Sequence, residues 1–148
     1  MNRLVSLTLG LAPLVLLAAA LSGSARVSPG EPIRWLEDEG QAAAEAKRTG
    51  MPLLVDAWAE WCAACKLLDR HTWSDPRVQR KVRQSFVPLR LDLTELGPPT
   101  DEKMQAYRVD VLPTIIACLP LACASGTEKR VTGYLPPDEM LAFLDSRR

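Results

Sequence analysis

The chain has 148 residues, which suffices for one domain with a hydrophobic core. Its 18 basic and 18 acidic side chains cancel, and no basic patch or acidic tail stands out. This balance argues against a nucleic-acid-binding protein or an electrostatic interaction arm, so we expect no nucleic-acid partner.

The N-terminal segment has the pattern of an export signal. Arg3 precedes an apolar run from Leu4 to Leu21, and small residues follow as far as Ala25. One positive charge, an apolar stretch and small residues are typical of a secretory signal peptide. We therefore predict that residues 1–25 are a signal peptide and that the mature protein is periplasmic. The apolar run is close to the lower limit for a membrane span, so an uncleaved anchor in the inner membrane is the alternative.

The remaining sequence alternates strand and helix signals. Residues 26–32 are rich in proline and glycine and predict a linker, and the domain is expected at 33–148. Residues 53–58 form a continuous apolar run, typical of a buried strand. In chain order we predict a strand at 33–35, a helix at 37–48, a strand at 53–58, helices at 63–70 and 76–84, a strand at 86–93 and a helix at 100–107. Paired strands follow at 114–119 and 128–133, and a last helix begins at 137. This order predicts an α/β fold, with a central mixed sheet flanked by helices on both faces.

Two cysteines three positions apart carry the strongest chemical signal. Cys62 and Cys65 follow the predicted strand and open the predicted helix. A thiol at a helix N-terminus has a lowered pKa, because unpaired backbone N–H groups favour the thiolate. We predict that Cys62 is the nucleophile of thiol–disulfide exchange and that Cys65, one turn later, resolves the mixed disulfide.

Three further positions fit this chemistry. Asp56 lies within the apolar strand, where burying a carboxylate is costly, and we expect it to relay a proton to or from Cys65. Leu112 and Pro113 precede a strand; a cis bond there would let the loop pair with an extended substrate chain. Trp61, beside Cys62, is expected to contact substrate.

These residues resemble the thioredoxin-fold family. The resemblance rests on WAEWCAACK, on Asp56 before it and on Leu112-Pro113-Thr114 after it, and it covers the chain from about residue 33 to 144. CAACK, TWSDPRV from residue 72 and RVTGY from residue 130 are most similar to the C-terminal periplasmic domain of the DsbD thiol:disulfide interchange proteins. The resemblance implies the roles given above for Cys62, Cys65 and Asp56, a cis-proline at Pro113, and a second acid near the site at Asp69.

The cysteine motif alone does not distinguish a reductase from an oxidase or isomerase. DsbD-like proteins also carry a membrane domain and another periplasmic domain, and we find neither in this sequence. We therefore expect a monomeric protein-disulfide reductase that needs no cofactor and takes electrons from a separate membrane protein. Ala63 and Ala64 add no charge that would specially stabilise the reduced thiolate, which favours a reductase over the alternative, an oxidase or isomerase on the same fold.

A second cysteine pair stands apart from this motif. Cys118 and Cys123 bracket four residues in the predicted hairpin, and in an exported domain the simplest expectation is a structural disulfide. A second exchange pair and two unpaired thiols are the alternatives. The spacing of the four cysteines also admits a zinc-stabilised binding module, although the long sequence between the pairs argues against metal ligation.

Overall fold

The predicted mixed sheet is confirmed. The computed structural model describes residues 30–120 and 122–146, so the predicted signal peptide lies outside the described residues. The four strands lie in the order β2-β1-β3-β4. β1 is parallel to β2 and antiparallel to β3, which pairs antiparallel with β4. Their bounds are β1 Leu53–Trp58, β2 Val87–Asp92, β3 Thr114–Cys118 and β4 Lys129–Thr132.

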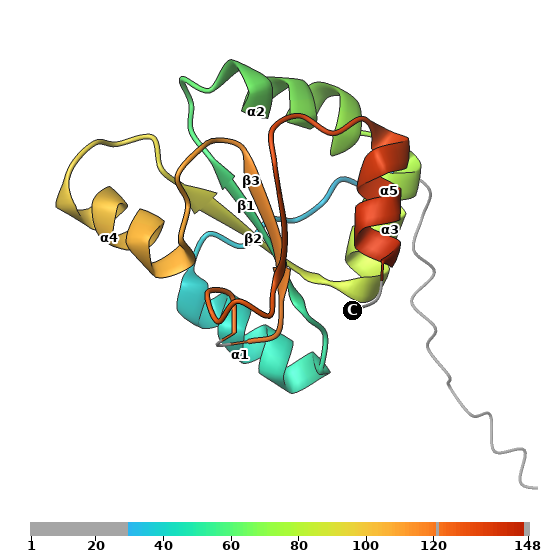
Figure 1. The fold of residues 1–148 in the computed structure, drawn as a ribbon. Coiled ribbons are helices and arrows are strands. Elements are labelled where there is room, and N and C mark those ends of the chain that lie inside the picture. Colours follow the sequence, from blue (N-terminus) through green and yellow to red (C-terminus); the bar gives the residue numbers. More distant parts are fainter. Residues whose placement is uncertain (1–29, 121, 147–148) are drawn as a thin grey trace, which may run out of the picture.

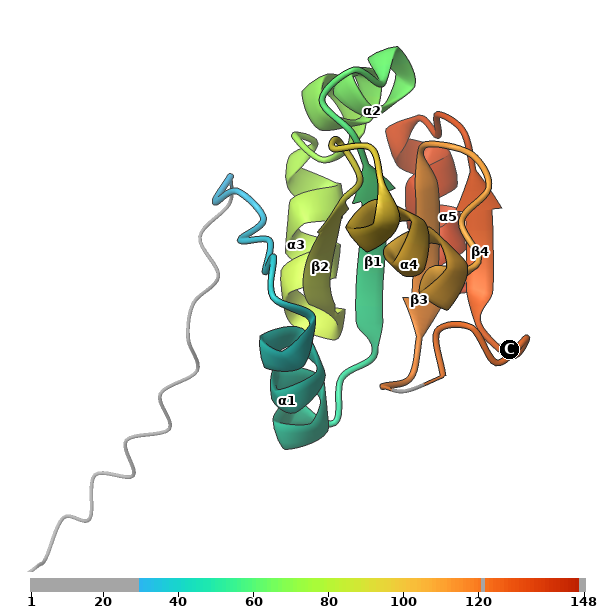
Figure 2. The same cartoon turned by 90° about the vertical axis from the view of Figure 1, so that its left-hand side faces the viewer.

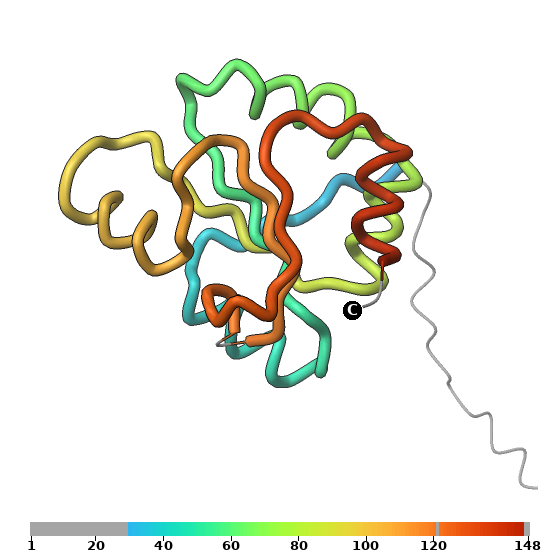
Figure 3. Tube along the Cα trace, viewed as in Figure 1, coloured from blue at the N-terminus to red at the C-terminus, as the bar shows by residue number. Residues whose placement is uncertain are grey.

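Helices cover both faces of this sheet, as the sequence predicted (Figures 1 and 2; Figure 3 traces the chain in the view of Figure 1). Side chains alternate between the faces of each strand, so Val55 packs with α1 and α4 while Leu54 packs with α3 and α5. Each face therefore has its own hydrophobic core. The helices are α1 Glu39–Thr49, α2 Ala63–Leu67, the π-helix η1 Leu68–Thr72, α3 Pro76–Ser85, α4 Pro98–Tyr107 and α5 Pro137–Asp145.

One predicted strand does not form, and one predicted helix begins at another residue. No regular strand forms at 33–35; instead Leu36 makes a single bridge to Leu89 of β2. The chain leaves this edge at once because Asp38 caps α1 with its carboxylate, two residues later. Helix α4 begins at Pro98 rather than after Thr100, since proline fits the first turn of a helix, where its missing N–H has no partner to lose.

The helix that follows the first cysteine pair also differs from the prediction. It was expected as one helix from Ala63 to about Arg70, but it continues past Leu67 as a π-helix, in which the N–H of Trp73 bonds to the carbonyl of Leu68 at 2.8 Å. π-Helical turns are rare and recur at functional sites. This one carries Asp69.

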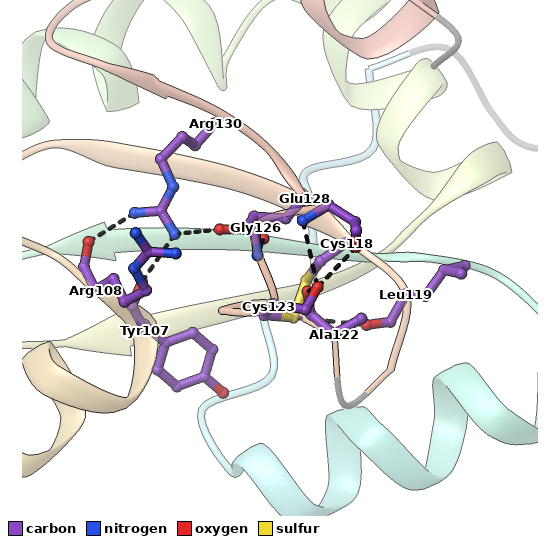
Figure 4. A network of polar contacts seen from close by, with 11 residues as sticks. Tyr107, Arg108, Cys118, Leu119, Ala122, Cys123, Gly126, Glu128 and Arg130 are labelled. Atoms are coloured by element: carbon purple, nitrogen blue, oxygen red, sulfur yellow. Dashed lines mark hydrogen bonds and ion pairs between the residues drawn. A yellow bond between two sulfur atoms is a disulfide. The ribbon is translucent and has the colours of Figure 1, made fainter.

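The Cys118 and Cys123 pair forms a disulfide at the base of the β3–β4 hairpin (Figure 4). Both residues are buried and join the core cluster on the α1 face. The expected bond is therefore present. Its structural role stays a prediction.

Polar contacts tie the same hairpin to the end of α4 (Figure 4). The buried carboxylate of Glu128 accepts the N–H of Gly126 at 2.7 Å and a guanidinium N–H of Arg130 at 2.9 Å. The Arg130 guanidinium also donates to the carbonyls of Arg108 and Tyr107, at 2.6 and 3.1 Å. These bonds satisfy carbonyls that the last turn of a helix leaves without intrahelical partners.

Candidate active site

The cysteine pair lies where strand β1 gives way to helix α2, as predicted. Cys62 is the N-cap of α2 and is joined to Cys65 by a disulfide. The sulfur of Cys62 accepts the backbone N–H of Cys65 at 3.1 Å. This N–H has no intrahelical partner, so in the reduced protein it would stabilise a thiolate at Cys62.

Only one of the two cysteines lines an open surface groove. A groove of about 600 Å³ is lined by Cys62 but not by Cys65, and both cysteines are otherwise buried. An incoming disulfide can therefore reach Cys62 first. The roles of attacking and resolving thiol stay a prediction, and this asymmetry is the one that attack by Cys62 requires.

The segment that precedes β3 also lines this groove. The Leu112–Pro113 peptide bond is cis, as expected, and Leu112 packs against the cysteine cluster. Leu112 lines the groove, whereas Pro113 is buried beneath it. The structure thus brings the predicted loop and the cysteines together.

Trp61 stands at the rim with 61% of its surface exposed. Its indole N–H donates to the carbonyl of Thr94 at 3.0 Å, and the backbone N–H of Glu60 donates to the Thr94 hydroxyl at 2.9 Å. These two bonds join the cysteine loop to the segment between β2 and α4. The Trp61 ring is therefore held in place although it is largely exposed.

Asp56 is buried in the middle of β1, as the sequence indicated. Burial raises the pKa of its carboxyl from 3.8 to about 6, although the neighbouring Arg90 guanidinium lowers it. Arg90 lies directly opposite on β2 and donates to the Asp56 carboxylate at 2.7 Å. The nearby carboxylate of Asp69 also raises the pKa of Asp56, by charge repulsion.

Arg90 is the residue that the sequence analysis missed. Its guanidinium also donates to the carboxylate of Asp69 at 2.6 Å, so it bridges both acids. The rings of Trp35 and Trp58 lie 4.9 and 5.0 Å from it and shield it by cation–π contact. The sequence does show a charged side chain, Arg90, inside a predicted strand. Its partner Asp56 cannot be identified without the β1–β2 register.

The zinc alternative is contradicted by the topology. Cys118 pairs with Leu53 at the start of β1, whereas Cys62 follows the far end of that strand. Six strand residues span roughly 20 Å, so the two pairs cannot share one metal ion. Among residues 30–120 and 122–146, no three His, Cys, Asp or Glu side chains cluster as metal ligands would.

A second hollow of about 600 Å³ lies near Cys118 and Leu119, at the other end of the sheet, and shares no residue with the groove at Cys62. Trp73 is buried, whereas His71 is exposed.

Comparison with known proteins places this geometry in a family. A family model described as thioredoxin-like matches residues 34–116. The chain belongs to the thioredoxin-like family. The matched residues include the cysteine pair, Asp56, Arg90 and the cis-proline segment.

Among curated proteins, the chain is similar to the thiol:disulfide interchange protein DsbD of Actinobacillus pleuropneumoniae serotype 5b (strain L20), with 35% identity over 99 residues. The alignment covers 65% of this chain but only 16% of that protein, so the similarity concerns one portion of DsbD.

Solved structures support the fold. The oxidised C-terminal domain of Neisseria meningitidis DsbD superposes with a TM-score of 0.64 at 19% identity, covering 78% of this chain and 100% of that one. A thioredoxin from Thermus thermophilus gives a TM-score of 0.63 at 27% identity, covering 77% of this chain and 85% of that one.

Within the part of the chain that the structure describes, no helix is both long and apolar enough to cross a membrane.

Proposed function

We propose that the protein is an exported thiol:disulfide oxidoreductase that acts as a protein-disulfide reductase. The observation that carries this proposal is the placement of Cys62. It caps α2, it is bonded to Cys65, and it alone of the pair faces the groove. The similarity to DsbD supports the same reaction class.

The reaction follows from this geometry. The Cys62 thiolate attacks one sulfur of a protein disulfide; a Cys62–substrate bond forms, and the departing sulfur takes up a proton. Cys65 then attacks the sulfur of Cys62, which releases the second substrate thiol and closes the Cys62–Cys65 disulfide. Two electrons and two protons pass to the substrate.

Asp56 is proposed to accept the proton that Cys65 loses. A general base works best with a pKa near the operating pH, and a pKa of about 6 meets that requirement better than an ordinary aspartate does. Trp58 links the two parts of the site, because it packs against the cysteine cluster and lies against Arg90, the partner of Asp56.

The reducing direction and the partners are further parts of the proposal. Ala63 and Ala64 supply no charge to stabilise the reduced form, so the oxidised form is not specially disfavoured. Outside the cytoplasm a dithiol stays reduced only if electrons are supplied. We therefore propose periplasmic localisation behind the N-terminal signal, and a membrane protein as the electron donor.

The reduction potential of the Cys62–Cys65 pair tests the direction. It should be measured with Cys118 and Cys123 changed to serine, in defined thiol buffers, by alkylation of the free thiols. We expect a value near that of thioredoxin, about −270 mV, whereas a value near about −120 mV, as for the oxidant DsbA, would mean that the protein forms disulfides.

Single cysteine variants test the roles of the two sulfurs. Cys62→Ser should abolish reduction of insulin, and Cys65→Ser should accumulate mixed disulfides with substrate. Efficient insulin reduction by the Cys62→Ser protein would refute the proposed function.

A further inference from the structure

The groove beside Cys62 combines an apolar floor with exposed apolar side chains. Leu96 is 87% exposed and Val111 is 52% exposed, and with Trp61 they line its rim. Exposed apolar side chains gathered around one hollow mark a surface that another molecule covers. Because Cys62 lies in that hollow, its occupant is the chain that carries the target disulfide.

The charge of the same groove has one sign. Asp101 and Asp110 are exposed, and they are the charged residues among those that line it. Neither forms an ion pair with any residue in the described parts of the chain. Arg108 shares an adjoining hollow with both aspartates but does not line the groove. The carboxylates are thus left to interact with an occupant.

Other charges around the rim do not reverse this sign. Lys66 lies near Cys62 but is 3.6 Å from the carboxylate of Glu60, which offsets it. Glu95 adds an exposed carboxylate next to Leu96 on the loop that Trp61 holds. A basic chain entering the groove therefore meets favourable potential, and an acidic one meets repulsion.

We propose that the groove selects protein disulfides whose attacked cysteine lies in an extended, apolar segment with lysine or arginine nearby. Trp61, Leu96 and Val111 cover the apolar side chains of that segment, and Asp101 and Asp110 pair with its basic ones. This selectivity rests on the proposed function, since it concerns the substrate of the same site.

The size of the preference follows from exposed ion pairs. Two such pairs correspond to about a five- to tenfold difference in kcat/KM between a basic and a neutral substrate at low salt. Because the pairs are exposed, about 0.5 M salt should remove most of that difference.

Three matched disulfide peptides test the proposal with the full chain. They share one apolar sequence and differ only in two residues beside the cysteine, which are lysine, glutamine or glutamate. The protein is first reduced with dithiothreitol and freed of it, so that its Cys62–Cys65 dithiol supplies the two electrons. Reduction of each peptide is followed by release of a quenched fluorophore, and hydroxyethyl disulfide serves as a small neutral substrate. We expect the order lysine, glutamine, glutamate in kcat/KM.

Two double variants separate local from overall charge. Asp101→Asn with Asp110→Asn should abolish the preference for lysine. Glu37→Gln with Glu139→Gln removes the same charge from exposed positions outside the groove, and it should leave the preference intact. An equal loss in both variants would show that net charge alone steers the peptides and would overturn the proposal.

The remaining outcomes separate this inference from the proposed function. Equal reduction of all three peptides would overturn the charge selectivity while leaving disulfide exchange in place. Failure to reduce any peptide or hydroxyethyl disulfide would overturn both.

Discussion

Replacing Asp56 with asparagine should stabilise the oxidised protein at neutral pH. The carboxylate is buried, and burial raises its pKa from 3.8 to about 6 despite the adjacent Arg90. A raised pKa means that the folded state binds the proton more tightly than the unfolded state does. The associated stability is fully present below pH 4 and is lost as the pH rises through 6.

The magnitude follows from the same change in pKa. A tenfold change in proton affinity is worth about 1.4 kcal/mol, so the rise from 3.8 to about 6 corresponds to about 3 kcal/mol above pH 7. Asparagine has nearly the same shape and does not ionise, so the variant avoids this cost. Arg90 keeps its bond to Asp69 and is not left without a carboxylate.

Urea unfolding at pH 4 and pH 7.5 measures the effect. We expect the variant and the original protein to differ little at pH 4, and the variant to be more stable by up to about 3 kcal/mol at pH 7.5. Asp69→Asn is the comparison variant, because Asp69 also binds Arg90 but is only partly buried. Loss of its charge lowers the pKa of Asp56, so its effect should be smaller than that of Asp56→Asn. If the effect of Asp56→Asn on the free energy of unfolding were the same at both pH values, the Arg90 pair would cancel the desolvation of the carboxylate and our reasoning would be wrong.

Three further predictions address other parts of the structure. Changing both Cys118 and Cys123 to serine should lower the free energy of unfolding by about 2 kcal/mol, the chain-entropy value for so short a loop, as measured by urea unfolding. Arg90→Met should raise the pKa of Asp56 further and move the pH profile of disulfide exchange upward, whereas Arg90→Lys should largely preserve it; identical profiles for all three proteins would exclude Arg90 from tuning the acid. Trp61→Ala should raise KM for a protein disulfide more than for hydroxyethyl disulfide in steady-state assays, and equal effects on both would argue against substrate contact.

Much of the fold was predictable because its signals are local. The apolar run of β1 has the bounds that the sequence indicated, and the Asp75–Pro76 pair starts α3 as a cap followed by a first-turn proline. The start of α4 was predicted wrongly, because Gly97 and the two prolines after it read as a break in regular structure. The same prolines also form the first turn of α4. The sequence analysis also missed the π-helix, which reflects how the helix packs rather than any residue preference.

In the site, too, residues marked by a local sequence signal were predicted, and the residue that depends on strand pairing was not. Cys62, Cys65 and Asp56 were singled out from their spacing within one segment, whereas the cis bond at Pro113 was implied by the family resemblance. Arg90 could not be found in this way, since its role depends on which β1 residue lies beside it.

The parallel register of β1 and β2 determines which β1 residue lies beside Arg90. It places Asp56 opposite Arg90 and Val55 opposite Leu89, so the charged pair lies on the face that α3 and α5 cover, and the apolar pair lies in the core on the α1 face. A shift of one residue would bury the guanidinium in the α1 core and leave Asp56 without a cation, at a cost of several kcal/mol for each unpaired charge. The same pair that holds the pKa of Asp56 near 6 therefore also opposes alternative pairings of β1 and β2.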